Sequence, residues 1–439
     1  MKKTLKKIGL FILILPFALL LLATIGYLAF ALYAVGGESA EHQAYLKKNM
    51  QEVRLGADNR FGIFDETFYA NKVFLLGEVH GYAMPQELDF ELLKHLNQTL
   101  GLKYYLAEVD YSQAHFLNEY LRTGDEALLR YVFQTWVEQN AQWGNQNFYQ
   151  KLQKIYDLNK SLPDDRKIRI FGVDKIQDIA VTKRHLGELL QNKQEGIVLD
   201  SLTKLVQNDA DTTEMLPAFA SRLMQETDMG KPLKEYMASG QTEVQHILQN
   251  LAYRHDQVKR DSVMFLNMAS LTTINNLQNE QFYGMWGIFH TLQTSVNNGF
   301  RPFAALLKYN ESPFKGKVVS INILANDSEN MIPARMMPEA LNKGNAYVNT
   351  TWVNNDGPLV FVDGIKDLKA VTKKNSITIF KVDAENSPYR TSSRLAETTI
   401  LIPNQGIKPD AENPTITQAC QYVVLIRNSK ALTPIKTLL

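Results

Sequence analysis

Five ionisable side chains in this sequence stand at or just after the ends of short apolar runs. The runs are rich in β-branched and aromatic residues, a composition typical of buried parallel strands. Ligands bind outside the carboxyl ends of the strands in an open parallel sheet, so these side chains would converge on one edge. The five, in chain order, are Glu78, His80, Glu108, Asp174 and His290.

Each of these residues could instead cap its own strand or the helix that follows. All four runs share one order, however: an apolar stretch comes first, and a residue able to do chemistry comes next. We therefore expect one common site rather than four separate caps. The runs are Val73–Gly77, Lys103–Ala107, Ile168–Val173 and Phe282–Phe289.

Two kinds of chemistry fit these residue types. Glu78 and His80 are two residues apart, and on an extended segment such residues point the same way. A carboxylate-supported imidazole can take a proton from water while a second imidazole stabilises the developing charge. Two histidines and two carboxylates can equally hold Zn²⁺ or Mn²⁺, which would lower the pKa of a bound water. In either case the catalytic set is Glu78, His80, Glu108 and His290.

Other classes of protein find little support in the sequence. The net charge is +1, and no basic patch with interleaved aromatic residues predicts nucleic-acid binding. The chain has neither a Gly-x-Ser-x-Gly elbow nor a Walker-type phosphate loop. Cys420 is the only cysteine, which excludes an intramolecular disulfide and a thiolate metal cluster. The apolar run Tyr422–Ile426 beside it indicates a buried, structural cysteine.

The amino terminus has the pattern of a membrane anchor. Residues 1–7 are basic, and the mostly apolar stretch of residues 8–35 is longer than the roughly 20 residues that span a bilayer as a helix. A cleavable signal peptide has a shorter apolar region and small residues at its cleavage site, where Leu32 is bulky. We therefore expect an uncleaved signal-anchor, with the amino terminus in the cytoplasm and the main domain outside it.

The remaining chain predicts an α/β domain. Residues 36–70 are polar and weakly patterned, and we interpret them as a juxtamembrane segment. Residues 71–439 alternate strand and helix patterns, which predicts a largely parallel sheet with flanking helices. Within them, about residues 178–279 have almost no strand signal and predict a long helical insert, a cap or lid beside the strand ends. Three further strands are predicted, and residues 384–417 are expected to be mostly loop; the strands are Val318–Leu324, Ile377–Val382 and Tyr422–Ile426.

Five ordered motifs resemble those of the erythromycin esterase-like superfamily. That superfamily also includes haem-binding uptake proteins and Tiki-type membrane metalloproteases. The resemblance spans about residues 71–438, and its specificity lies in the order and spacing of the motifs, because each motif is short. The motifs are Leu76–Gly81, Leu106–Glu108, Gly172–Asp174, Arg260–Met264 and Trp286–His290.

In the esterase branch, the resemblance implies that His80 is a general base assisted by Glu108, with His290 as the second imidazole. Residues implied to bind the substrate are Arg260, Asp261 and Asp174. One departure concerns the first motif, where two residues usually separate the glutamate and the histidine in esterases. Here only Val79 separates them, which puts the exact role of Glu78 in doubt.

The other branches imply other functions. Tiki-type proteins carry Gly-x-x-His twice, and both Gly77–His80 and Gly287–His290 fit that pattern. A divalent metal would then be held by His80, Glu108, His290 and Glu78. The haem-uptake branch would make this a binding protein without turnover. The arginine and the helical insert are more similar to the esterase branch. We therefore expect a membrane-anchored hydrolase of an ester or amide bond in a small molecule or peptide, with no cofactor favoured and the oligomeric state open.

Overall fold

The computed structural model describes residues 2–56, 61–191, 196–208, 214–226, 237, 239–337, 339–342, 344–401 and 405–436. Its centre is an eight-stranded sheet with the strand order β1-β10-β12-β6-β2-β5-β3-β4. The strands are β1 (Met50–Val53), β2 (Val73–Glu78), β3 (Tyr104–Tyr105), β4 (Arg169–Ile170), β5 (Phe282–Gly287), β6 (Val318–Asn326), β10 (Ser376–Lys381) and β12 (Tyr422–Arg427).

Each predicted apolar run contains one of these strands, and the sheet is largely parallel as expected. The strands from β12 across to β4 all pair in parallel. Two antiparallel strands complete one edge, since β10 pairs with β12 and β1 pairs with β10. The polar segment of residues 36–70 therefore contributes an edge strand, together with the helices α2 (Ala40–Lys48) and α3 (Glu66–Tyr69).

Alternating side chains of β2 face two different helical layers. Phe74 and Leu76 pack in one apolar cluster with α4 (Ala83–Leu100), α5 (Tyr111–Thr123), α6 (Glu126–Glu138) and α7 (Gln146–Ser161). Val73 and Leu75 pack on the opposite face with α13 (Arg260–Ile274) and α14 (Phe303–Tyr309). This alternation follows from the period of two along a strand. Because all of β2 is buried, its sequence is a continuous apolar run rather than an alternating one.

The helix between β2 and β3 ends at a glycine. Gly101 closes α4 in a left-handed conformation with φ of 71°, and its N–H bonds back to the last turn. Further along, residues 111–161 contain three helices, α5, α6 and α7. Asp110 and Asp125 cap the first two, because their side chains accept hydrogen bonds from backbone N–H groups of the first turn.

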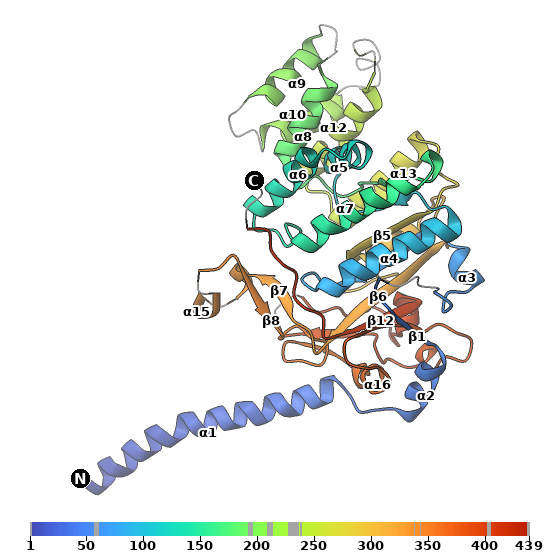
Figure 1. Cartoon of the computed structure of the whole chain (residues 1–439). Helices are drawn as coiled ribbons and strands as arrows, with labels where there is room; N and C mark the ends of the chain where they lie inside the picture. The colour runs from blue at the N-terminus through green and yellow to red at the C-terminus, as the bar shows by residue number, and fades with distance from the viewer. Residues whose placement is uncertain are drawn as a thin grey trace.

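The helical insert forms a separate layer at one end of the molecule. Its helices α8, α9, α10 and α12 share their own apolar cluster, and they lie at the top of Figure 1, beyond α5. The last helix of the insert, α13, instead packs against the sheet. The first four helices are α8 (Ile179–Leu189), α9 (Ile197–Gln207), α10 (Met215–Glu226) and α12 (Gln241–His255).

The amino-terminal helix projects from the opposite end (Figure 1). This helix, α1 (Lys2–Ala34), contains one window, Phe17–Ala34, that is long and apolar enough to cross a membrane or to serve as a signal sequence. Its last turns contact β9 (Val360–Val362). Phe30 and Tyr27 pack edge-on against Phe361, with ring centroids 5.5 Å and 6.4 Å away.

Two small antiparallel sheets, β7–β8 and β9–β11, lie outside the main sheet. The sequence did not predict them, and β11 falls in the region expected to be mostly loop. The remaining elements of this end of the chain are β7 (Asn330–Pro333), β8 (Tyr347–Thr350), β11 (Thr398–Ile400), α15 (Glu339–Asn342), α16 (Ile365–Val371) and α17 (Ile416–Ala419).

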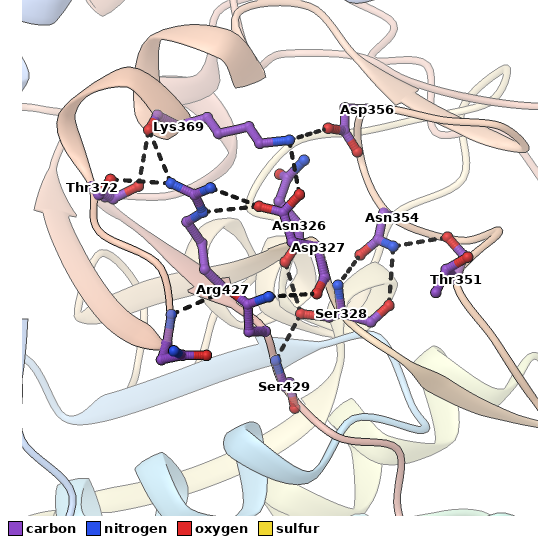
Figure 2. Close-up of polar contacts among 12 residues, drawn as sticks. Asn326, Asp327, Ser328, Thr351, Asn354, Asp356, Lys369, Thr372, Arg427 and Ser429 are labelled. Carbon is purple, nitrogen blue, oxygen red and sulfur yellow. Dashed lines mark hydrogen bonds and ion pairs between the residues drawn. The ribbon is translucent and has the colours of Figure 1, made fainter.

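A network of polar side chains links residues 351–372 to the carboxyl ends of β6 and β12 (Figure 2). Asp327 accepts hydrogen bonds from Arg427 Nη2 at 2.7 Å and Nε at 3.1 Å, and Lys369 Nζ lies 3.0 Å from its other oxygen. Asn354 exchanges two hydrogen bonds with the backbone of Ser328. The network therefore holds in place the turn from β6 to β7, at the edge where the predicted site lies.

Candidate active site

Glu78 and His80 form a hydrogen-bonded pair just beyond β2. The distance between His80 Nδ1 and Glu78 Oε1 is 2.5 Å. Glu78 is buried and His80 is partly exposed. Burial alone would lower the pKa of His80, but the neighbouring carboxylates of Glu78 and Glu108 raise it to about 9. Since Nδ1 faces Glu78, the second ring nitrogen, Nε2, is the one left for a substrate or a water.

Two glycines in the predicted motifs allow the close packing around this pair. A methyl group on Gly77 would overlap Thr291 Oγ1 and lie 2.7 Å from Asn322 Oδ1, so only glycine fits there. A methyl group on Gly287 would lie 3.4 Å from His80 Nε2 and 3.6 Å from the ring of His290. Gly287 therefore lies between the two imidazoles, and its lack of a side chain leaves the space beside His80 Nε2 open.

Glu108 lies beyond β3 and faces the same space. Its Oε2 accepts a hydrogen bond from the backbone N–H of Gly287 at 2.8 Å, and its Oε1 accepts one from Arg260 Nη2 at 2.7 Å. Burial would raise the pKa of Glu108, but the charges of His80 and Arg260 lower it below its usual value. Glu108 is therefore an ionised carboxylate that joins β3 to the end of β5.

Arg260, at the first turn of α13, connects the acidic residues. Its Nε and Nη2 bind the two oxygens of Asp174 at 2.8 Å and 2.5 Å, the bidentate geometry that a guanidinium favours. Its Nη1 lies 3.3 Å from His290 Nε2. Burial would lower the pKa of Arg260, but the two carboxylates raise it above its usual value. Arg260 thus carries a fixed positive charge between Glu108, Asp174 and His290.

His290 is held from both sides. Its Nδ1 lies 2.9 Å from Asp261 Oδ1, and the same Asp261 oxygen accepts a hydrogen bond from the backbone N–H of Phe303 at 2.7 Å. Because Arg260 can only donate, His290 Nε2 is the acceptor in their contact, and the ring proton is then on Nδ1. His290 in this tautomer orients Arg260 and has no proton to donate toward the site from Nε2.

The structure arranges the seven residues singled out by the sequence in two hydrogen-bonded groups. Their roles in catalysis or substrate binding stay predictions. Glu78 and His80 form one group, and Glu108, Asp174, Asp261 and His290 gather around Arg260 in the other. The two groups meet at a cavity that Glu78, His80 and Glu108 all line. The first four helices of the insert contribute no described residue to either of the two cavities that border His80.

A small cavity of about 40 Å³ borders the pair. Glu78, His80, Glu108 and Lys151 are among its lining residues, and it has room for one or a few waters. Glu78 Oε2 is buried, with no hydrogen-bond partner among the described residues. A water in this cavity would lie within reach of both the carboxylate and the imidazole.

Several residues around the cavity were missed at the sequence level. Trp143 packs against His80, with ring centroids 5.0 Å apart, and Asn330 donates a hydrogen bond to the backbone carbonyl of His80 at 2.7 Å. Neither follows a recognisable pattern, because Trp143 lies in an irregular segment and Asn330 is the first residue of β7. Lys151 did carry a signal: it falls on the apolar face of α7, in helical register with Phe148 and Ile155.

The donor set does not fit a divalent metal. Among the residues that the structure describes, no group of three or more His, Cys, Asp or Glu is arranged to hold an ion. The reason is the guanidinium of Arg260, which contacts Glu108, Asp174 and His290 and so occupies the positions a cation would take. Among the four predicted ligands, His80 Nε2 and the buried Oε2 of Glu78 are the atoms without a described hydrogen-bond partner, and two donors are too few for a tetrahedral ion.

Comparison with known proteins places the fold. No protein-family model and no curated protein matches this sequence. Solved structures do match. A Bacillus cereus protein has 13% identity and a TM-score of 0.65, and the match covers 91% of this chain and 100% of that one. A succinoglycan biosynthesis protein has 11% identity and a TM-score of 0.64, and the match covers 91% of this chain and 100% of that one. A mutant of the erythromycin esterase EreC in its open conformation has 14% identity and a TM-score of 0.59, covering 86% and 95%. The chain therefore shares its fold with the erythromycin esterase EreC, the fold that its motifs predicted.

Proposed function

We propose that this chain is a membrane-anchored hydrolase of an ester or amide bond, with His80 as the general base. The observation that carries the proposal is the 2.5 Å contact between His80 Nδ1 and Glu78 Oε1, which directs Nε2 toward the space beside Gly287. A carboxylate that orients an imidazole and supports its positive charge is the arrangement that general-base catalysis needs.

The reaction can be written with the residues present. Neutral His80 takes a proton from a water through Nε2 as the water oxygen adds to the substrate carbonyl carbon. Glu78 stabilises the imidazolium, and Arg260 provides positive charge near the oxyanion. The tetrahedral intermediate then breaks its carbon–oxygen or carbon–nitrogen bond, and His80 returns the proton to the leaving group. The products are a carboxylic acid and an alcohol or amine.

The other predicted residues support this pair and the arginine. Asp174 and Glu108 fix the guanidinium of Arg260, and Asp261 fixes His290, which in turn accepts a hydrogen bond from Arg260. The same contacts count against the metalloprotease alternative. A divalent ion bound to Glu108 and His290 would lie next to the guanidinium of Arg260, and the two positive charges would repel each other. We place the site outside the cytoplasm, since α1 would cross the membrane with its basic flank inside.

The direct test is hydrolysis by the full chain with a panel of chromogenic esters and amides. We expect turnover that persists in a chelator, and a fall in kcat/KM of about 10²–10⁴-fold in His80→Ala, the usual effect of losing a proton-transfer group. His95→Ala is the matched control, because His95 lies on α4 and bonds to Tyr69 Oη away from the site. Unchanged turnover in His80→Ala would refute the proposal. A haem absorption band without any hydrolysis would favour the ligand-binding alternative.

A further inference from the structure

A second, larger cavity of about 300 Å³ borders His80. Its walls are mostly aliphatic, with Val79, Ile332, Val353, Val360 and Ile400 among them. The described lining residues include no aspartate, glutamate, lysine or arginine. His80 is therefore the one described lining residue that can carry a charge near neutral pH. Since His80 is part of the wall, an apolar group that fills this cavity would end beside the proposed base.

One wall of this cavity also faces the amino-terminal helix. Val360 of β9 and Ile400 of β11 are paired across the small sheet and both line the cavity. The next pair along, Phe361 and Thr399, points to the opposite face. There Phe361 packs against Phe30 of α1. A single two-stranded sheet therefore separates the cavity from the outer end of the proposed membrane span.

The rim of the cavity carries exposed apolar side chains. Met336 is 51% exposed and Trp352 is 37% exposed, and both line the cavity. Tryptophan favours the interface between membrane and water. Tyr27 Oη of α1 donates a hydrogen bond to the carbonyl of Pro358, the residue before Leu359 of the cavity wall. These contacts place the rim near the membrane surface if α1 spans the bilayer as proposed.

We propose that this cavity binds the acyl chain of a lipid ester taken from the adjacent membrane leaflet. The inference rests on the proposed function, because the ester carbonyl would lie at His80 with the acyl chain in the cavity. A largely apolar wall suits a hydrocarbon chain, and His80 is the one described lining residue that could pair with a charged substrate. Its position beside α1 gives an amphiphile a short path from the bilayer.

The volume sets the length of chain that fits. A methylene group is about the size of a water, which takes about 30 Å³, so the cavity accommodates about ten such groups. Each buried methylene contributes about a fourfold gain in binding. The preference for acyl chains should therefore rise steeply with length and level off at about ten carbons.

The test measures kcat/KM of the full chain, held in a detergent-free amphipol, for p-nitrophenyl esters of straight-chain acids from two to twelve carbons. We expect a rise of up to about fourfold per methylene, and then a plateau. Ile332→Trp, which fills the cavity from β7, should flatten this rise. Ile197→Trp on α9 is the matched control, because Ile197 is 88% exposed in the insert, and it should keep the wild-type slope. Met336→Trp at the exposed rim is a second variant that the fold tolerates more easily.

Two outcomes would overturn the inference: a wild-type profile that does not depend on chain length, or equal slopes in Ile332→Trp and Ile197→Trp. Calorimetric titration with straight-chain fatty acids separates this failure from that of the proposed function. If no ester is hydrolysed but acid binding tightens with chain length and weakens in Ile332→Trp, the cavity assignment stands and the hydrolase proposal fails. If esters are hydrolysed without regard to length, the reverse holds.

Discussion

At the scale of single residues, Glu78 decides the pH at which His80 can act as a base. Burial lowers the pKa of the imidazole, yet the carboxylate 2.5 Å away raises it to about 9. Below that pH the free protein holds His80 mainly as the imidazolium, which cannot accept a proton from water. The Glu78 carboxylate therefore strengthens the base and reduces the fraction of it that is available near neutral pH.

The first prediction follows from the raised pKa of His80. In the wild-type chain, kcat/KM should rise with pH and level off only above about 9, because His80 must lose its proton to work. In Glu78→Gln the carboxylate is gone and burial dominates, so the rising limb should move to lower pH. Its plateau should fall by about 10²-fold, since the imidazolium then lacks its hydrogen-bonded carboxylate. The measurement is the pH profile of kcat/KM from pH 5 to pH 10.

Glu188→Gln is the control for loss of one negative charge, because Glu188 lies on α8, near His115 and Arg184 and away from the site. It should leave both the limb and the plateau in place. A limb at the same pH in Glu78→Gln and in the wild type would show that Glu78 does not set the pKa of His80.

At the scale of elements, a buried ion pair joins α4, α7 and β3 behind the site. Lys151 is 3% exposed and Asp89 is fully buried, and their Nζ and Oδ2 atoms are 2.5 Å apart. Tyr105 donates a hydrogen bond to the same oxygen at 2.5 Å and accepts one from Lys151 at 3.0 Å. Because Lys151 borders the small cavity at Glu78, this cluster positions the back wall of the site.

Removing one member of this pair should be costly. Lys151→Met leaves Asp89 buried without its cation, so we expect the free energy of unfolding to fall by about 3–5 kcal/mol. The double variant Lys151→Met with Asp89→Leu should recover much of that loss, since no charge is then buried. Urea unfolding followed by circular dichroism measures both. Lys154→Met, an exposed position one turn along α7, should change stability by less than about 0.5 kcal/mol. Equal stability of Lys151→Met and Lys154→Met would contradict the role of the ion pair.

At the scale of the whole molecule, the two ends differ in what they contact. The insert of α8, α9, α10 and α12 lies at one end, and α1 projects from the other (Figure 1). The apolar cavity and its exposed rim belong to the end that carries α1. With α1 in a bilayer, as we propose, the helical insert would lie away from the membrane and the rim of the apolar cavity would lie near it.

The third prediction concerns the orientation of the whole chain. Because four lysines precede the apolar span and the flank after it has mixed charge, the domain should lie outside the cytoplasm. Protease added to intact spheroplasts should therefore digest the domain, while a cytoplasmic marker protein stays protected. Full protection of the domain, or recovery of a soluble form that begins near Val35, would contradict the anchored topology.

Much of the central fold could be predicted from the sequence alone. Each run of β-branched and aromatic residues was long enough to indicate a buried strand, and all of β2, β5, β6, β10 and β12 were found where such runs occur. A strand buried on both faces must be apolar at every position, so its signal is local. The predicted strands in turn indicated that four side chains lie near one another, because parallel strands end at one edge of a sheet. These are Glu78, His80, Glu108 and His290.

Other features depended on contacts between distant segments. Five strands are only three or four residues long: β1, β7, β8, β9 and β11. Their sequences carry little strand pattern, because pairing with strands elsewhere in the chain stabilises them. The apolar cavity beside His80 could not be predicted for this reason, since β7, β8, β9 and β11 all contribute to its walls. The family resemblance identified Arg260, but its placement between Glu108, Asp174 and His290 required the structure. Residue types and spacing therefore determined which groups could do chemistry, and tertiary packing decided which charge each one faces, because electrostatic partners are set by distance in space.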